Sequence, residues 1–245
     1  MINYNSEVDE KSAQEYYNLA VVGRELQNFN LALACYNKAI ELNPYYKDAY
    51  INRGVIYIIL KNYTQAIIDF TNAVEIDKNC VEAYNNRGIA YSYLKNYKNS
   101  VADFTKMIEL EPNNPQFYFN RGFVHRDFNY FNKALEDFTQ AIILGFCTDE
   151  IFVFRGEMNF KLKNYRAAVD DFKTAIEINP ANILAHKNLG NLHLEMGDYL
   201  WAIEDFSNVI RLNPKDAEAY YKRAKVLKLK ADADLIKAEI LGYKK

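Results

Sequence analysis

Arginine and aspartate recur in register along this chain, and together they are the first candidate for chemistry. Each arginine of the series is followed sixteen residues later by an aspartate, and the series advances in steps of 34 residues. The pairs are Arg53 and Asp69, Arg87 and Asp103, Arg121 and Asp137, and Arg155 and Asp171. Because an unpaired charge inside an apolar stretch is costly, we expect structural ion pairs between helices that set register more than they add stability. The alternative is a row of arginines that binds phosphate.

The sequence contains no comparable set of residues that could carry out catalysis. The three histidines, His125, His186 and His193, fall at positions that aromatic residues hold elsewhere in the chain, which favours a role in packing. No nucleophile, histidine and acid combine into a catalytic group, and no glycine-rich phosphate loop occurs. The three cysteines form no metal-binding pattern. The sequence therefore predicts a protein that is not an enzyme and has no cofactor and no metal.

The elements that would position these residues follow a period of 34. The segment "AYINRGVIYIILKNYTQAIIDF" begins at residue 49 and returns as "AYNNRGIAYSYLKNYKNSVADF" at residue 83, with no insertion. Such a period indicates stacked units in a solenoid. A lead-in at 1–12 precedes the units, and a seventh, partial unit with a capping helix spans 217–245. The six full units of 13–216 are 13–46, 47–80, 81–114, 115–148, 149–182 and 183–216.

The positions that repeat within a unit have a recognisable pattern. An aromatic residue stands at position 4, glycine at 8, an aromatic at 11, alanine at 20, phenylalanine or tyrosine at 24, alanine at 27 and proline at 32. This pattern resembles the tetratricopeptide repeat. The resemblance implies an all-α fold, a right-handed α-solenoid in which each unit is a first helix, a short turn and a second helix. The fourth unit departs from it, because "LGFC" replaces Asn-Pro at 144–147.

Helical geometry assigns the repeated positions to faces. Positions 4, 7, 8 and 11 lie on one face of the first helix, at about 100° per residue. Small residues such as Gly54 at position 8 let neighbouring helices approach closely. The arginines at position 7 share this packing face, which favours ion pairing over phosphate binding.

The opposite face of the first helix, at positions 2, 5, 6, 9, 12 and 13, is where a ligand is expected. In the tetratricopeptide family this helix lines the concave wall, so these positions form a groove. Contiguous exposed apolar residues mark interaction sites. Burial by strong curvature or by a dimer partner is the alternative. The apolar groove residues are Ile51, Val55, Ile58, Ile59, Ile89, Tyr93, Phe119, Phe123, Val153 and Phe160.

Asparagine occupies position 6 of most units. The series is Asn18, Asn52, Asn86, Asn120 and Asn188, interrupted by Phe154. An amide both donates and accepts hydrogen bonds, so it can grip a peptide backbone whatever the peptide's sequence. Helices spaced about 8–10 Å apart match about three residues of extended chain. The series resembles the asparagine ladder of O-linked N-acetylglucosamine transferase. Alternatively, these amides contact only water or a neighbouring turn.

Composition narrows the class of partner. The net charge is −2, which gives no field for nucleic acid or an anionic membrane. The chain opens without a secretory signal and has no apolar run of membrane-spanning length, so a cytoplasmic location is expected. Acidic residues at position 2, such as Asp48 and Glu82, favour a partner with basic flanks.

The sequence as a whole predicts a non-catalytic scaffold, an adaptor that binds an extended or helical peptide of a protein partner. A homo-oligomer assembled through the same apolar strip is the alternative. An RNA-binding helical repeat is a more remote one, because such repeats have a 35-residue period and a basic inner face.

Overall fold

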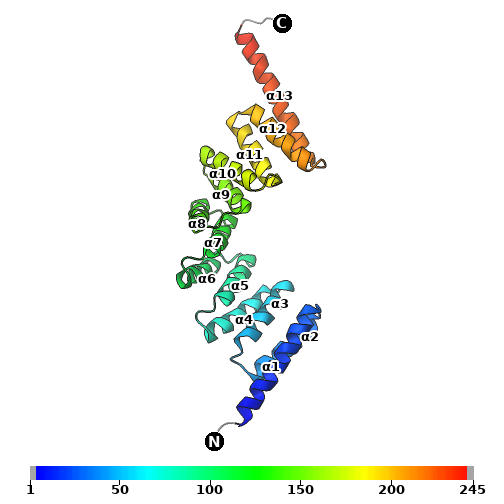
Figure 1. The fold of residues 1–245 in the computed structure, drawn as a ribbon, viewed down its shortest axis with the longest axis vertical. Coiled ribbons are helices and arrows are strands. Elements are labelled where there is room, and N and C mark those ends of the chain that lie inside the picture. The colour runs from blue at the N-terminus through cyan, green and yellow to red at the C-terminus, as the bar shows by residue number, and fades with distance from the viewer. Residues whose placement is uncertain (1–3, 242–245) are drawn as a thin grey trace. The chain divides into compact units, whose positions relative to one another are not determined.

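A computed structural model describes residues 4–241, with side chains from residue 12 onward apart from that of residue 239. The described residues form thirteen α-helices and no strand (Figure 1). They divide into two compact units, 1–124 and 125–245, with the boundary inside α7. The first unit holds α1 (Tyr4–Glu25), α2 (Phe29–Leu42), α3 (Lys47–Ile59), α4 (Tyr63–Ile76), α5 (Val81–Tyr93), α6 (Tyr97–Leu110) and most of α7 (Pro115–Asp127). The second holds α8 (Phe131–Ile143), α9 (Asp149–Lys161), α10 (Tyr165–Ile178), α11 (Ile183–Met196), α12 (Tyr199–Leu212) and α13 (Ala217–Ile240).

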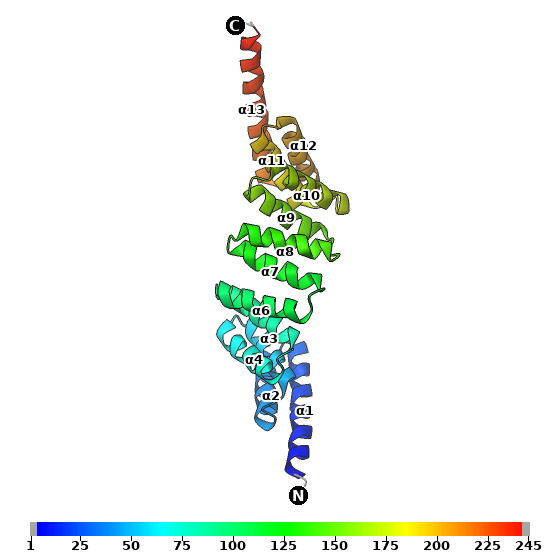
Figure 2. The same cartoon turned by 90° about the vertical axis from the view of Figure 1, so that its left-hand side faces the viewer.

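Within each unit, a repeat folds as a pair of helices that pack on each other and on the next pair. In the first unit α1 packs on α2, α3 on α4 and α5 on α6, while α2 and α4 also contact the first helix of the following repeat. In the second unit α9 packs on α10 and α11 on α12, and α13 packs on α12. The pairs can be followed from two sides in Figures 1 and 2. The expected all-α solenoid of helix-turn-helix units is thus confirmed. None of the described helices is long and apolar enough to cross a membrane.

The ends of the helical series are longer than a single repeat helix. The lead-in expected at 1–12 is helical from Tyr4, because α1 continues back from the first repeat. The seventh half-unit and the segment expected to cap it form one continuous helix, α13.

The turn within each repeat is specified by its local sequence. An asparagine at position 16 caps the second helix in the first three repeats, where Asn28, Asn62 and Asn96 accept hydrogen bonds from backbone N–H groups. The preceding residue adopts a left-handed conformation, with φ of 58° at both Lys61 and Lys95. These two features close the first helix and start the second within about three residues.

The core of the second, third, fifth and sixth repeats is a phenylalanine ring packed against a glycine. The phenylalanine at position 24 is at most 2% exposed in five successive repeats, at residues 70, 104, 138, 172 and 206. In the second repeat a Cβ atom added to Gly54 would lie 2.6 Å from Cε1 of Phe70. Glycine at position 8 therefore sets how closely the two helices of the pair approach.

Tyr36 takes the place of that phenylalanine in the first repeat. Its side chain is fully buried, and its hydroxyl has no hydrogen-bond partner among the described residues. Burial raises the pKa of the phenol to about 12. Because an unsatisfied buried hydroxyl costs about 1–3 kcal/mol, we expect Tyr36→Phe to increase the free energy of unfolding by about that amount. Urea denaturation followed by circular dichroism measures it. The control is Tyr45→Phe, since Tyr45 is 80% exposed. Lower stability of Tyr36→Phe would show that the native hydroxyl is satisfied.

The arginine and aspartate series forms ion pairs within repeats. Nε and Nη2 of Arg53 donate to the Asp69 carboxylate at 2.9 and 2.6 Å, and Arg87 binds Asp103 at 2.9 and 2.7 Å. Arg155 binds Asp171 in the same way. The pair of Arg121 and Asp137 stays a prediction, since these residues belong to different units.

Candidate functional site

Within each unit the first helices of successive repeats lie next to each other. Helix α3 contacts α5 in the first unit, and α9 contacts α11 in the second. Side chains 34 residues apart on these helices therefore form continuous rows, as the helical period requires. These rows carry the candidate peptide-binding residues.

The apolar row of the first unit is partly accessible. Ile59 and Tyr93 are 51% and 58% exposed. Five further side chains, Val55, Ile58, Ile89, Phe119 and Phe123, are half-buried. The Tyr93 ring stacks on Tyr63 with centroids 4.7 Å apart, so its orientation is fixed by the chain itself. In the second unit Phe160 is half-buried and its ring lies 6.0 Å from that of Tyr165.

Two residues expected in the groove are buried instead. Ile51 is 3% exposed and Val153 is 1% exposed. Both stand at position 5, whose side chain points toward the first helix of the next repeat. The hydrogen bonds of Tyr17 and Asn85, two other residues at position 5, to position 6 of the next repeat show this direction. Ile51 and Val153 therefore pack between helices and do not line an accessible surface.

The asparagines at position 6 hold adjacent first helices together. Asn52 accepts from Nη1 of Arg24 at 2.6 Å and donates to the Tyr17 hydroxyl at 2.9 Å and to the Asp48 carbonyl at 3.0 Å. In the same manner Asn120 donates to Oδ1 of Asn85 at 3.1 Å and Asn188 to Oε1 of Glu157 at 2.9 Å. A peptide that uses these three amides has to compete with bonds inside the chain.

Two members of the asparagine series keep more capacity for a ligand. Asn18 is exposed and accepts one bond, from Nε2 of Gln14 at 2.9 Å. Asn86 is half-buried, and its side chain makes no hydrogen bond to another described residue. An amide can donate two and accept two hydrogen bonds. Asn86, one helical turn from Ile89, is therefore the amide best placed to bind a backbone beside the apolar row.

Tyr17 and Arg24 are site residues that the sequence did not reveal. Both contact Asn52, and burial raises the pKa of the Tyr17 phenol, with the Asp48 carboxylate adding to the rise. The sequence could have identified them by their place at positions 5 and 12 of the first repeat, on the same helix face as Asn18.

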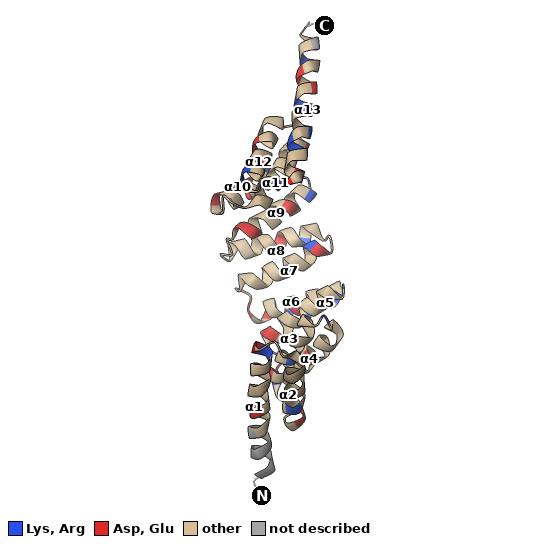
Figure 3. Cartoon of the chain, turned by 90° about the vertical axis from the view of Figure 1, so that its right-hand side faces the viewer, with Lys and Arg blue, Asp and Glu red and all other residues tan. Residues whose placement is uncertain are grey.

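At the N-terminal ends of α3 and α5, the exposed side chains at position 2 are acidic. Asp48 and Glu82, each at position 2 of its repeat, are exposed in the first unit. Figure 3 shows that acidic and basic residues are otherwise interspersed over the described helices. A cationic group next to an apolar segment is the chemistry that these helix ends complement.

Sequence and structure comparisons agree on the class of repeat. A model of the tetratricopeptide repeat matches residues 48–80, 81–114 and 183–216, and a second model, described as TPR repeat, matches 24–60 and 156–197. Together these matches cover more than half of the chain. No curated protein sequence matches it significantly.

Three solved structures of similar fold match this chain over most of its length. The C-terminal part of a TPR repeat-containing protein from Cytophaga hutchinsonii has a TM-score of 0.75 at 18% identity, covering 89% of this chain and 92% of its own. A tetratricopeptide repeat protein from Parabacteroides merdae has a TM-score of 0.73 at 19% identity, covering 96% and 95%. YrrB, described as a TPR protein with an unusual peptide-binding site, has a TM-score of 0.65 at 22% identity, covering 77% and 97%. At these identities the similarity shows the fold.

Proposed function

Because the chain belongs to the tetratricopeptide repeat family, we propose that it is a protein-interaction scaffold that binds a peptide segment of a partner along the first helices of its N-terminal unit. Proteins of this family are generally scaffolds of this kind. The observation that supports the location is the accessible apolar row on α3 and α5. Ile59 and Tyr93 leave about half of their side-chain surface in solvent there, beside the half-buried Ile58 and Ile89.

The surroundings of this row define the peptide. Apolar side chains of the peptide would cover Ile58, Ile59 and Ile89, which removes apolar surface from water. Asn86 would bind the peptide backbone with both groups of its amide. The carboxylates of Asp48 and Glu82 would attract a basic residue next to the apolar segment. The bound segment is thus apolar with a basic flank, in an extended or helical conformation.

A matched pair of substitutions tests the location. We expect Ile59→Glu to weaken partner binding at least tenfold, because it places a carboxylate on the apolar contact surface. Ile68→Glu is the control, since Ile68 lies on the second helix α4 with a similar exposed fraction, 47% against 51% for Ile59. Partners are captured on immobilised protein, identified by mass spectrometry, and their affinity is then measured by calorimetry with purified material.

Asn86→Ala separates backbone binding from apolar contact. Loss of one or two neutral hydrogen bonds at about 1 kcal/mol each predicts a decrease in affinity of several fold. Equal retention of every partner by wild type, Ile59→Glu and Asn86→Ala would rule out this surface. Sedimentation velocity at low concentration tests the self-association alternative, in which wild type would be oligomeric and Ile59→Glu monomeric.

A further inference from the structure

The fifth repeat, 149–182, differs at position 11 of its first helix from the second, third, fourth and sixth repeats, which carry a ring there. The second and third repeats have Tyr57 and Tyr91 there, and the fourth and sixth have His125 and His193. These rings lie beside the charged residues of their own repeats. His193 Nδ1, for example, is 2.7 Å from Oδ2 of Asp205. In the fifth repeat the residue is Asn159, which donates to Oδ2 of Asp171 at 2.9 Å but has no ring.

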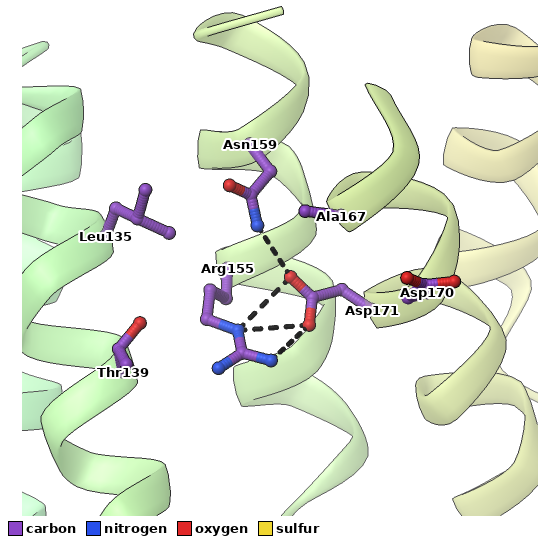
Figure 4. Close-up of a pocket in the computed structure, with 7 residues that line it drawn as sticks. All are labelled: Leu135, Thr139, Arg155, Asn159, Ala167, Asp170 and Asp171. Carbon is purple, nitrogen blue, oxygen red and sulfur yellow. Dashed lines mark hydrogen bonds and ion pairs between the residues drawn. The ribbon is translucent and has the colours of Figure 1, made fainter. Parts of the chain in front are cut away.

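The smaller side chain coincides with a cavity of about 400 Å³ in the C-terminal unit (Figure 4). Figure 4 shows Leu135 and Thr139 of α8 on one side and the Arg155–Asp171 pair with Asn159 on the other. Asn159 and Asp171 are 6% and 3% exposed, so the polar floor of the cavity is held in place by packing. Its residues are Leu135, Thr139, Arg155, Asn159, Ala167, Asp170 and Asp171.

The arginine of this repeat also has a hydrogen-bonding group to spare. In the second, third and fourth repeats Nη1 of the arginine donates to position 25 of the preceding repeat. Those bonds run from Arg53 to Asn37 at 2.6 Å, from Arg87 to Thr71 at 3.2 Å and from Arg121 to Thr105 at 3.1 Å. Nη1 of Arg155 makes no such bond, although Thr139 occupies position 25 of the preceding repeat, and neither group is hydrogen-bonded to another described residue.

We propose that this cavity binds the phenol side chain of a tyrosine supplied by a partner protein. The ring would lie beside Asn159, at the position in the repeat where the second and third repeats carry the rings of Tyr57 and Tyr91. Its hydroxyl would accept a hydrogen bond from Nη1 of Arg155 and donate one to Oγ1 of Thr139. Leu135 supplies an apolar wall for one ring face.

Charge selects against other side chains. Arg155 and Asp171 neutralise each other, and Asp170 at the rim leaves the lining with a net negative charge. The exposed Asp170 at the rim repels a carboxylate. An ammonium has no acceptor for the Nη1 donor of Arg155, so it leaves that group without a hydrogen bond. A neutral ring with one polar group fits both constraints. The cavity is formed largely by the second helices α8 and α10, so it is separate from the surface on α3 and α5 proposed above.

Binding of p-cresol, which is the tyrosine side chain as a free molecule, tests the proposal. Amide chemical shifts of the full chain are followed by nuclear magnetic resonance during titration, with an expected dissociation constant of about a millimolar for so small a ligand. The shifts should map to residues 135, 139, 155, 159 and 171. Toluene, which lacks the hydroxyl, should bind several-fold more weakly. Absence of mapped shifts, or equal affinity for toluene, would overturn the proposal.

Two substitutions test the assignment from the side of the protein. Asn159→Tyr puts the chain's own ring in the cavity and should weaken p-cresol binding at least tenfold. Thr139→Val keeps the size of the side chain but removes the hydroxyl that accepts from the phenol, so it should bring the affinities for p-cresol and toluene closer together. If Asn159→Tyr proves unfolded by circular dichroism, Thr139→Val and the wild-type map still decide. An unchanged p-cresol affinity in a folded Asn159→Tyr, or an unchanged preference for p-cresol in Thr139→Val, would contradict the assignment.

A peptide distinguishes a partner's tyrosine from a free phenol. Acetyl-Ala-Ala-Tyr-Ala-Ala-amide should shift the same residues as p-cresol, and the phenylalanine version should bind more weakly. Shifts with p-cresol but none with the tyrosine peptide would overturn the assignment to a partner protein.

Discussion

Asp69→Ala is expected to reduce the free energy of unfolding by about 3–5 kcal/mol, because it leaves a buried guanidinium without its carboxylate. The Asp69 side chain is fully buried and that of Arg53 is 14% exposed. Burial raises the pKa of the Asp69 carboxyl, and the two hydrogen bonds from Arg53 oppose that rise. Urea denaturation measures the loss. Glu41→Ala is the control, since the pair of Lys38 and Glu41 is exposed and such pairs contribute about 0–1 kcal/mol.

A double substitution shows whether the pair specifies register or supplies stability. The first repeat has Leu19 and Cys35 at the two positions that Arg53 and Asp69 occupy in the second. Arg53→Leu/Asp69→Cys therefore gives the second repeat a solution that this chain already uses. Replacing a buried ion pair by apolar residues is often neutral or stabilising, so we expect the double variant to recover most of the stability that Asp69→Ala loses. A double variant as unstable as Asp69→Ala would show that the ion pair itself stabilises the fold.

The single substitution Arg53→Leu adds a pH dependence with a defined sign. It removes the group that opposes the burial effect, so the folded-state pKa of Asp69 rises further above its unfolded value. Between the unfolded-state and the folded-state pKa, the folded protein then binds more protons than the unfolded one. The free energy of unfolding therefore falls as pH rises through these two pKa values. The free energy of unfolding of Arg53→Leu, minus that of wild type, should therefore be larger at pH 5 than at pH 7. The same difference from wild type at both values would contradict this account.

The fold was predictable because each determinant is local and recurs. The 34-residue period, the glycine at position 8 and the ring at position 24 each describe a contact within one repeat, such as Gly54 against Phe70. The ion pairs within a repeat were predictable for the same reason, since Arg53 and Asp69 belong to the two helices of one pair.

The site was less predictable because it depends on contacts between repeats. Angles around a single helix place Ile51 on the open face, yet the next repeat covers it. The same helical angles predicted that the asparagines at position 6 form a row available to a ligand. In the structure, Asn52 is hydrogen-bonded to Tyr17 and Arg24 of the preceding repeat. The cavity beside Asn159 likewise depends on the separation of Arg155 and Thr139, which belong to different repeats. Sequence patterns specify which residues share a face, but not how far the neighbouring repeat extends over it.

Gly54→Leu is expected to lower the free energy of unfolding by about 3 kcal/mol or more, because the side chain has no space to enter. A Cβ atom at Gly54 would lie 2.6 Å from Cε1 and 2.8 Å from Cζ of Phe70, a fully buried ring. Overpacking of this kind costs about 1–3 kcal/mol and sometimes more. Leucine is a good helix former, so its intrinsic propensity works in the opposite direction.

Alanine substitutions at two equivalent glycines test the same contact in graded form. At Gly88 the added Cβ would lie 3.1 Å from the nearest atom of Phe104, against 2.6 Å from Phe70 at Gly54. Replacing glycine by alanine gains about 1 kcal/mol of helix propensity, which should roughly offset the milder overlap at Gly88 but not the closer one at Gly54. We therefore expect Gly54→Ala to be destabilised by about 1–2 kcal/mol and Gly88→Ala to stay near wild type, as measured by urea denaturation. Equal stabilities would mean that Phe70 moves aside at little cost, and that position 8 does not set the spacing of the helix pair.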